Sequence, residues 1–147
     1  MTQGLAQPAT AAGHDLVVRL AGLLGAEHVI TAAAELQFHA QDVYGTAVAP
    51  VAVVRPGTVD ELAAAVQAVT DAGHAVIARG GGMSYTDGYL PVRASSVTFD
   101  TTRLDRVVEV NAADRYVTVE CGVTWKALAD ALAPHGLRTP YWGPLSG

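Results

Sequence analysis

The sequence has little cysteine, little positive charge and no long apolar run, and each absence excludes a class of partner or site. The single cysteine, Cys121, can form no internal disulfide and offers no second thiolate for a structural metal site. Charged residues make up 16% of the 147 residues, and the net charge of −5 provides no basic field that would attract nucleic acid. We therefore expect neither a metal nor a nucleic-acid partner.

The apolar segments are also too short to cross a bilayer. The run VYGTAVAPVAVV is interrupted by Gly45 and Pro50 and falls short of a membrane span. The first residues, MTQGLAQPATAAGH, have neither the basic start nor the apolar stretch of a signal peptide. We expect a cytoplasmic protein that does not contact a membrane.

The histidines do not form a metal-binding pattern. No two of them have the H-x-x-x-H spacing or another ligand spacing, and we expect capping or solvent-exposed roles for all five: His14, His28, His39, His74 and His135. The sequence therefore predicts no metal site.

Half of the residues are hydrophobic, which favours a packed core over disorder. Residues 1–13 are rich in Ala, Gln, Thr and Gly, and we predict a disordered lead there. Residues 14–147 are predicted to form part of one folded domain. The chain ends in a Pro- and Gly-rich loop directly after a predicted helix, so we expect a domain that continues beyond it.

The pattern of apolar residues predicts alternating helices and strands. A helix is predicted over 15–24, and the following segment TAAAELQFHAQDVYGTA is predicted to be mostly irregular. From residue 51 onward the patterns predict a strand (VAVVRP), a helix (TVDELAAAVQAVTDAG), a strand (HAVIA), a further strand (SSVTFDTT), a β-hairpin (VVEVNAADRYVTVECG) and a helix capped by Thr124. The strand–helix–strand unit predicts two parallel strands.

The first helix of that unit has a clear start and end. Thr58 is followed three residues later by Glu61, which predicts a capping box, and Gly73 stands at the position where a helix ends in a left-handed turn. In the second helix, Trp125 falls on the apolar stripe and is predicted to be core.

The stretch RGGGMSYTDGYLP, residues 79–91, follows the second strand of the unit and contains three consecutive glycines. It fits neither common phosphate loop, because Met83 stands where a P-loop needs lysine and Tyr85 where the dinucleotide fingerprint needs glycine. A tight turn and an anion-binding nest of backbone N–H groups both stay open. Arg79 and Ser84, which flank the glycines, favour a phosphate ligand.

Two longer segments carry a family resemblance: VVRPGTVDELAAAVQAVTDAGHAVIARGGGMSYTDG and VVEVNAADRYVTVECGVTWKALADALAPHGL. Together they resemble the start of the FAD-binding domain of the vanillyl-alcohol oxidase/p-cresol methylhydroxylase superfamily, from about Asp42 to the C-terminus. The resemblance implies an α+β fold, the N-terminal portion of a PCMH-type FAD-binding domain. In that fold a small βαβ-containing subdomain is followed by the hairpin and helix of a second subdomain.

The resemblance also implies which residues bind the cofactor. In this family the loop that matches Arg79 to Ser84 surrounds the FAD pyrophosphate, mostly through backbone N–H groups. Carried onto this chain, the candidate set is Arg79, Gly80, Gly81, Gly82, Met83, Ser84, Tyr85, Gly88 and, from a later segment near the flavin, Pro144 and Ser146. Arg79 would either bind phosphate or brace the loop, and both roles stay open here.

Met83 departs from the family pattern in a way that bears on cofactor attachment. Many members with covalent flavin have histidine at this position, and a thioether lacks the imidazole nitrogen for that bond. The resemblance therefore implies non-covalent FAD. Cys121 is predicted to be a buried structural thiol rather than a second attachment point.

The activity implied by the resemblance is that of an FAD-dependent oxidoreductase acting on a small alcohol, hydroxy acid, sugar lactone or phenol. The sequence identifies no catalytic acid, base or nucleophile, and we expect the 147-residue chain to be inactive alone. A missing C-terminal region or a second chain would complete the flavin site. The alternatives are a reductase or epimerase on the same scaffold, half of a split flavoprotein, and a non-catalytic interaction module. Tyr141 and Trp142 are candidates for contact with such a partner.

Overall fold

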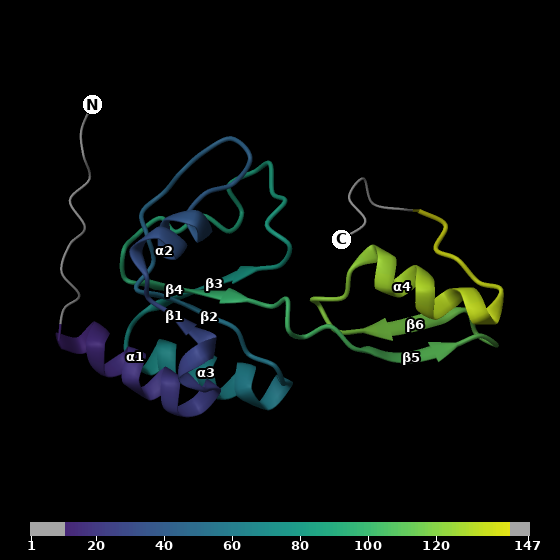
Figure 1. Cartoon of the computed structure of the whole chain (residues 1–147), viewed down its shortest axis with the longest axis horizontal. Helices are drawn as coiled ribbons and strands as arrows, with labels where there is room; N and C mark the ends of the chain where they lie inside the picture. The colour runs from purple at the N-terminus through teal and green to yellow at the C-terminus, as the bar shows by residue number, and fades with distance from the viewer. Residues whose placement is uncertain (1–10, 142–147) are drawn as a thin grey trace.

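The computed structural model describes residues 11–141, which form two lobes joined by one crossing of the chain (Figure 1). The first lobe, here called the sheet lobe, contains a four-stranded sheet with helices on both of its sides. The second, here called the hairpin lobe, is a two-stranded ribbon covered by a helix. The predicted division into a βαβ-containing part and a hairpin–helix part is confirmed.

The elements follow one another in the predicted order, with additions near the N-terminus. In the sheet lobe they are α1 (Ala11–Leu24), the 3-10 turn η1 (Ala26–His28), β1 (Val29–Ile30), α2 (Ala33–His39), β2 (Ala52–Val54), α3 (Val59–Asp71), β3 (Ala75–Arg79) and β4 (Ser96–Asp100). In the hairpin lobe they are β5 (Val107–Asn111), β6 (Tyr116–Val119), α4 (Trp125–Leu132) and the 3-10 turn η2 (Ala133–His135).

The sheet has the strand order β1-β2-β4-β3. Strands β2, β4 and β3 run parallel, and the short β1 is antiparallel to β2. The predicted β2–α3–β3 unit thus has parallel strands, but β4 lies between them. All five residues of β4 are buried, so this strand is covered on both faces and takes a central place in the sheet.

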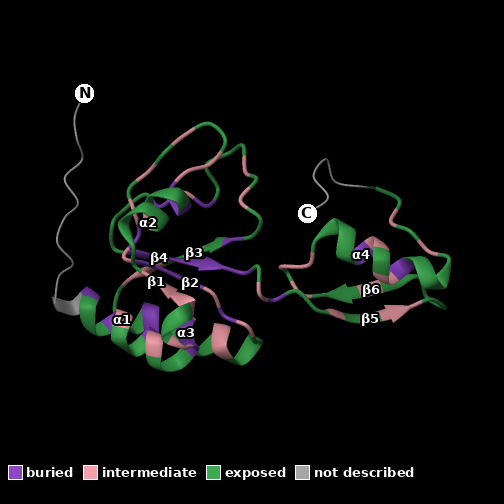
Figure 2. Ribbon diagram, viewed as in Figure 1, coloured by how far each residue is buried: buried purple, intermediate pink, exposed green. Residues whose placement is uncertain are grey.

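The core lies between the sheet and the pair α1 and α3, on one face of the sheet (Figure 2). The apolar stripe of α1 meets small residues of α3, whose Ala65 and Ala68 let the two helices approach closely. The core residues are Leu16, Leu20, Leu24, Val54, Ala65, Ala68, Val69, Val97 and Phe99. No helix within residues 11–141 has both the length and the apolar character required to cross a bilayer.

Helix α3 begins with a modified capping box. The hydroxyl of Thr58 accepts a hydrogen bond from the Glu61 N–H, as predicted. The Glu61 carboxylate accepts from the N–H of Gly57 at 2.7 Å, one residue before the expected partner. Gly73 ends the helix with φ 73°, the left-handed conformation predicted for it.

Two expectations about the N-terminal part need correction. Helix α1 begins at Ala11, so residues 11–13 belong to it rather than to the predicted disordered lead. Helix α2 forms inside the segment predicted to be irregular; Ala32, at its N-cap, makes no side-chain cap bond. This seven-residue helix has no start signal in the sequence, and Arg79 of β3 donates hydrogen bonds to the carbonyl oxygens of His39 and Gln41 at its end.

Candidate functional site

The glycine loop, residues 80–84, leaves the carboxyl end of β3. Within residues 11–141, the main-chain N–H groups of this loop donate no hydrogen bond to another protein group. Gly82 has φ 79°, which only glycine adopts without strain. The five main-chain N–H groups of residues 80–84 are therefore available to donate to an anion.

The three glycines differ in what surrounds them. A Cβ placed on Gly80 or Gly81 would have no heavy atom of residues 11–141 within 4 Å apart from its chain neighbours, so this part of the chain leaves open space beside both. A Cβ on Gly82 would lie 2.5 Å from the Arg79 guanidinium. Arg79 therefore contacts the loop at Gly82, while Gly80 and Gly81 face open space.

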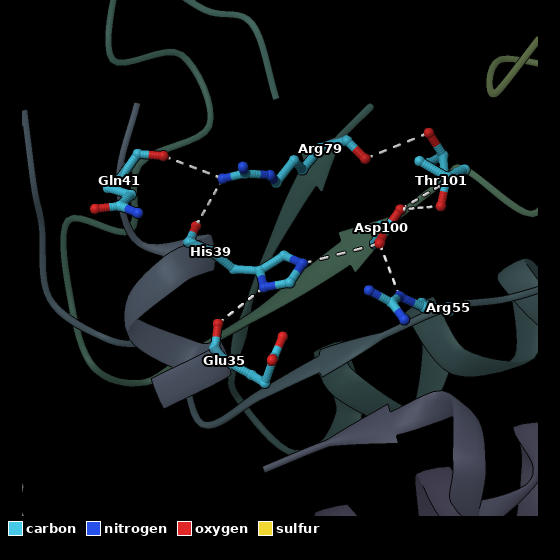
Figure 3. A network of polar contacts seen from close by, with 8 residues as sticks. Glu35, His39, Gln41, Arg55, Arg79, Asp100 and Thr101 are labelled. Carbon is cyan, nitrogen blue, oxygen red and sulfur yellow. Dashed lines mark hydrogen bonds and ion pairs between the residues drawn. The ribbon is translucent and has the colours of Figure 1, made fainter. Parts of the chain in front are cut away.

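Arg79 is buried, and its guanidinium group forms hydrogen bonds with main-chain atoms of the protein (Figure 3). Nη1 donates to the main-chain oxygens of His39 and Gln41, both at 3.1 Å. The guanidinium also lies over the Tyr89 ring, 4.5 Å from its centroid. The sequence left two roles open for Arg79, binding phosphate or bracing the loop. These contacts fit the second role.

Tyr89 is a contact of the loop that the sequence pattern did not reveal. Its side chain is buried, and its hydroxyl donates to the main-chain oxygen of Gly82 at 2.5 Å. The only signal in the sequence is a large aromatic residue near the end of a polar run, which does not distinguish a core residue from a loop support.

Asp100, at the carboxyl end of β4, is the centre of a buried polar network (Figure 3). It accepts from Arg55 Nε at 2.8 Å and from the N–H and hydroxyl of Thr102, and His39 Nε2 lies 3.8 Å from it. Burial alone would raise the pKa of Asp100, but the hydrogen bonds from Thr102 and Arg55 outweigh it and hold this pKa below its ordinary value of 3.8.

His39 contradicts the expectation that the histidines have capping or solvent-exposed roles. Its side chain is buried, with Nδ1 bonded to the Glu35 carbonyl at 2.9 Å. The role expected for His74 holds, since its Nδ1 contacts the Ala72 carbonyl just past the end of α3. Within residues 11–141 no three His, Cys, Asp or Glu side chains form a group that could hold a metal ion.

The segment after the glycine loop contacts both the loop and the 40–46 segment. Ser84 accepts from the N–H of Thr86 at 3.2 Å, and the exposed Tyr85 ring lies 5.8 Å from the ring of Tyr44. Gly88 lines a separate hollow of about 440 Å³ along β3. Of these three predicted cofactor residues, none lines the cleft described next.

Asp42 joins the two segments. Its carboxylate accepts from the N–H groups of Tyr44, Gly45 and Asp87. These bonds, the one from Tyr44 foremost, lower the pKa of Asp42 from its ordinary value of 3.8. Asp42 and Asp87 are therefore turn residues.

A cleft of about 600 Å³ separates the glycine loop from the hairpin lobe. Gly81 and Met83 line it on one side. Its other lining residues are Thr102, Asp105, Cys121, Gly122, Val123, Thr124, Trp125 and Ala127. The amino-terminal turn of α4, capped by the Thr124 hydroxyl, thus lies across the cleft from the glycine loop.

Two residues predicted to be buried are found at this cleft instead. Cys121 is exposed, because it follows β6, a strand of a two-stranded ribbon that is largely open to solvent. Trp125 is 36% exposed and lines the cleft at the first turn of α4. Leu128 and Leu132, further along α4, form the buried stripe that was predicted.

Gly122 forms the joint between the lobes. Its N–H donates to the main-chain oxygen of Leu104 at 2.7 Å. A Cβ at this position would lie 2.8 Å from that oxygen and would overlap the carbonyl oxygen of Thr101. Only glycine fits here, and sequence reasoning had not singled it out.

The remaining candidates lie at the C-terminus. Pro144 and Ser146 lie outside the described residues, as does Trp142. Tyr141 is 69% exposed.

Comparison with known proteins decides the family. The family model described as an FAD binding domain matches residues 50–146, which cover the glycine loop, the joint and the cleft. The chain belongs to this family. FAD is therefore the cofactor of this FAD-binding domain, as the resemblance implied.

Curated relatives are oxidoreductases much longer than this chain. An uncharacterised FAD-linked oxidoreductase of Mycobacterium tuberculosis is 31% identical over 136 residues, 90% of this chain and 29% of that protein. L-gulono-1,4-lactone dehydrogenase of the same organism is 38% identical over 89 residues, 60% of this chain and 20% of that protein. The chain thus spans less than a third of the length of these relatives.

Solved structures confirm the fold. The chain matches p-cresol methylhydroxylase with a TM-score of 0.75 at 22% identity, covering 93% of this chain and 27% of that one. It matches 4-ethylphenol oxidase from Gulosibacter chungangensis with a TM-score of 0.73 at 25% identity, covering 90% and 27%. The predicted α+β fold, the N-terminal portion of a PCMH-type FAD-binding domain, is therefore correct.

The residues present fit FAD. A diphosphate needs several converging donors and a close approach to the main chain. The N–H groups of residues 80–84 have no acceptor within the described part of the chain, and Gly80 and Gly81 have open space beside them. The glycine loop meets both requirements.

Proposed function

We propose that this FAD-binding domain is the first part of an FAD-dependent oxidoreductase, and that the glycine loop holds the FAD diphosphate. The observation that carries the proposal is the row of N–H groups at residues 80–84 that have no acceptor within residues 11–141, beside glycines that face open space in that part of the chain. The family membership and the oxidoreductase names of the relatives support it.

When bound, FAD would accept a hydride from the substrate. The chain's own part is to bind and orient the cofactor. The main-chain N–H groups of residues 80–84 would donate to the diphosphate oxygens, and Gly80 and Gly81 would allow its close approach. Gly82 would turn the loop, and Ser84, whose oxygen accepts from the Thr86 N–H, would add its hydroxyl proton as a donor.

The other candidate residues have smaller parts in this proposal. Met83 lines the cleft and is half exposed, so it would lie near the cofactor without a bond to it. Tyr85 and Gly88 would shape the segment that follows the loop. Pro144 and Ser146 stay predicted contacts.

The substrate would be a small alcohol, hydroxy acid, sugar lactone or phenol. The relatives named for D-lactate, L-gulono-1,4-lactone and 4-ethylphenol represent three of these classes, a hydroxy acid, a sugar lactone and a phenol. Residues that contact the substrate would come from a further region of the same protein or from a second chain. A cytoplasmic location stays a prediction.

FAD binding by the purified chain tests the proposal. We expect flavin fluorescence to be quenched on titration with the chain, and Gly81→Val to weaken this binding by about tenfold or more because its side chain fills the space beside the loop. Gly22→Ala is the matched control, since Gly22 also has no heavy atom near its Cβ position but lies in α1. Unquenched flavin at every concentration, or equal affinity of both variants, would contradict the proposal.

The mode of attachment is tested separately. We propose non-covalent FAD, because Met83 cannot form the histidyl bond. Acid precipitation of the loaded protein should release all of the yellow colour into the supernatant. Colour retained in the pellet of the wild type but not of Cys121→Ser would show instead that the exposed thiol carries the flavin.

A further inference from the structure

Within residues 11–141, the side chains of Arg79 and Tyr89 both meet the glycine loop at Gly82. The Arg79 guanidinium lies against the position that a Cβ of Gly82 would occupy, and the Tyr89 hydroxyl donates to the Gly82 oxygen at 2.5 Å. Both contacts come from buried side chains. The residue that turns the loop is therefore held from two sides, while Gly80 and Gly81 are not held by side chains.

Arg79 is itself fixed by the end of helix α2. Its Nη1 donates to the carbonyl oxygens of His39 and Gln41, which are main-chain groups at and just after the last residue of α2. The ring of Phe38, also in α2, lies 5.5 Å from the guanidinium. The place of Arg79 thus depends on the place of α2.

His39 connects the end of α2 to the sheet (Figure 3). Its Nδ1 carries a proton, because the partner is the Glu35 carbonyl, which can only accept. Its Nε2 faces the Asp100 carboxylate at 3.8 Å. Asp100 is paired with Arg79 in the β3–β4 register and is bonded to Arg55, so it is firmly placed.

We propose that Arg79, His39 and Tyr89 are positioning residues that set the direction of the N–H groups of the glycine loop and do not touch FAD. The inference rests on the proposed function, the binding of the FAD diphosphate by this loop. A loop held in its binding conformation before FAD arrives loses less conformational entropy on binding. Contacts from Asp100 through His39 and Arg79 to Gly82 provide this preorganisation.

The test compares FAD affinity among five variants of the purified chain, including both Arg79→Lys and Arg79→Ala. We expect His39→Asn and Tyr89→Phe each to weaken FAD binding by about tenfold, the size typical when the residues that support a binding site are lost. Arg79→Lys should weaken it at least as much, because an ammonium keeps the charge but cannot hold two carbonyls and cover a ring. Thr58→Ala, which removes the cap of α3 and breaks none of the contacts of Arg79, His39 or Tyr89, should leave FAD affinity unchanged.

The outcomes separate this inference from the proposed function. A wild-type chain that does not bind FAD overturns both. Wild-type affinity in His39→Asn and Tyr89→Phe, with binding intact in the wild type, overturns the positioning role alone. Retained affinity in Arg79→Lys together with loss in Arg79→Ala would mean that Arg79 contacts the diphosphate directly, since a point charge suffices for phosphate.

Stability could obscure the result for His39, because it is buried. Tyr89→Phe removes one oxygen and keeps the ring beneath Arg79, so this variant is expected to fold. If His39→Asn does not fold, the FAD affinity of Tyr89→Phe tests the inference. The Thr58→Ala control shows what general loss of stability does to FAD affinity. A parallel loss in Thr58→Ala and Tyr89→Phe would overturn the inference.

Discussion

The glycine loop and the joint at Gly122 form opposite sides of one cleft, and both depend on glycine for different reasons. At the joint the protein's own carbonyls occupy the space where a side chain would be. At Gly80 and Gly81 that space is open and the neighbouring N–H groups have no protein acceptor among residues 11–141. A glycine has a structural role where other protein atoms occupy the space beside it. A glycine with open space beside it, and with free N–H groups next to it, is a candidate for contact with a ligand.

Gly122→Ala is expected to give the largest effect on stability. A methyl group there would overlap the Thr101 oxygen, so the two lobes would have to move apart, at a cost of about 3 kcal/mol in the free energy of unfolding. Urea denaturation followed by circular dichroism measures this. A midpoint equal to that of the wild type would mean that the lobes are not held together at this point.

Asp100→Asn should have the next largest effect, because it removes the charge at the centre of the buried network. We expect a loss of about 2 kcal/mol at neutral pH, the size of a hydrogen bond to a charged group. The sheet lobe should be weakened while the hairpin lobe keeps its native amide signals in NMR spectra. Equal broadening in both lobes would contradict a local role.

The same variant gives a pH dependence with a defined sign. The pKa of Asp100 is lowered in the folded protein from 3.8, so its contribution to stability is present above about pH 4 and is lost as the pH falls through the lowered value. The difference in unfolding free energy between wild type and Asp100→Asn should therefore shrink below pH 4. A difference that stays constant down to pH 2 would rule out the charge as its cause.

The N-caps of α3 and α4 allow the two lobes to be compared through a smaller effect on stability. Thr58→Ala and Thr124→Ala each remove a hydroxyl that accepts from a main-chain N–H, and each should cost about 1 kcal/mol. Urea denaturation measures both. If Thr124→Ala costs nothing while Thr58→Ala does, then α4 gains its stability from elsewhere in the hairpin lobe.

The smallest effect on stability is expected for Gly81→Ala. Because nothing lies within 4 Å of the new methyl group and φ of Gly81 is not positive, the free energy of unfolding of the free chain should change by less than about 0.5 kcal/mol. Thermal unfolding without FAD measures this. A loss as large as that of Gly122→Ala would remove the distinction between the two kinds of glycine.

Much of the fold could be predicted because its signals are local. The cap of Thr58, the left-handed Gly73 and the apolar stripes of α1 and α3 depend on neighbours within a few residues. The sequence does not show that β4 lies between β2 and β3. The order of the strands depends on which strand is covered on both faces, and that is decided by the tertiary structure. Helix α2 was missed because the hydrogen bonds at its end come from Arg79, which is far from it in the sequence.

The candidate site was only partly predictable for the same reason. Three glycines between Arg79 and Ser84 indicated a ligand loop, and the family resemblance supplied FAD. The brace formed by Tyr89 and the end of α2, the joint at Gly122 and the exposure of Cys121 all depend on distant parts of the chain. Sequence spacing gives no information on such contacts.

The central position of β4 has a consequence for the order in which the chain can fold. Strands β2 and β3 share no ladder, and each pairs in parallel with β4, which follows both in the sequence. A growing chain that has emerged only as far as residue 79 therefore has two unpaired strand edges and no means of joining them. We expect this stretch to be prone to aggregation until Asp100 leaves the ribosome, and truncations between β3 and β4 to be insoluble.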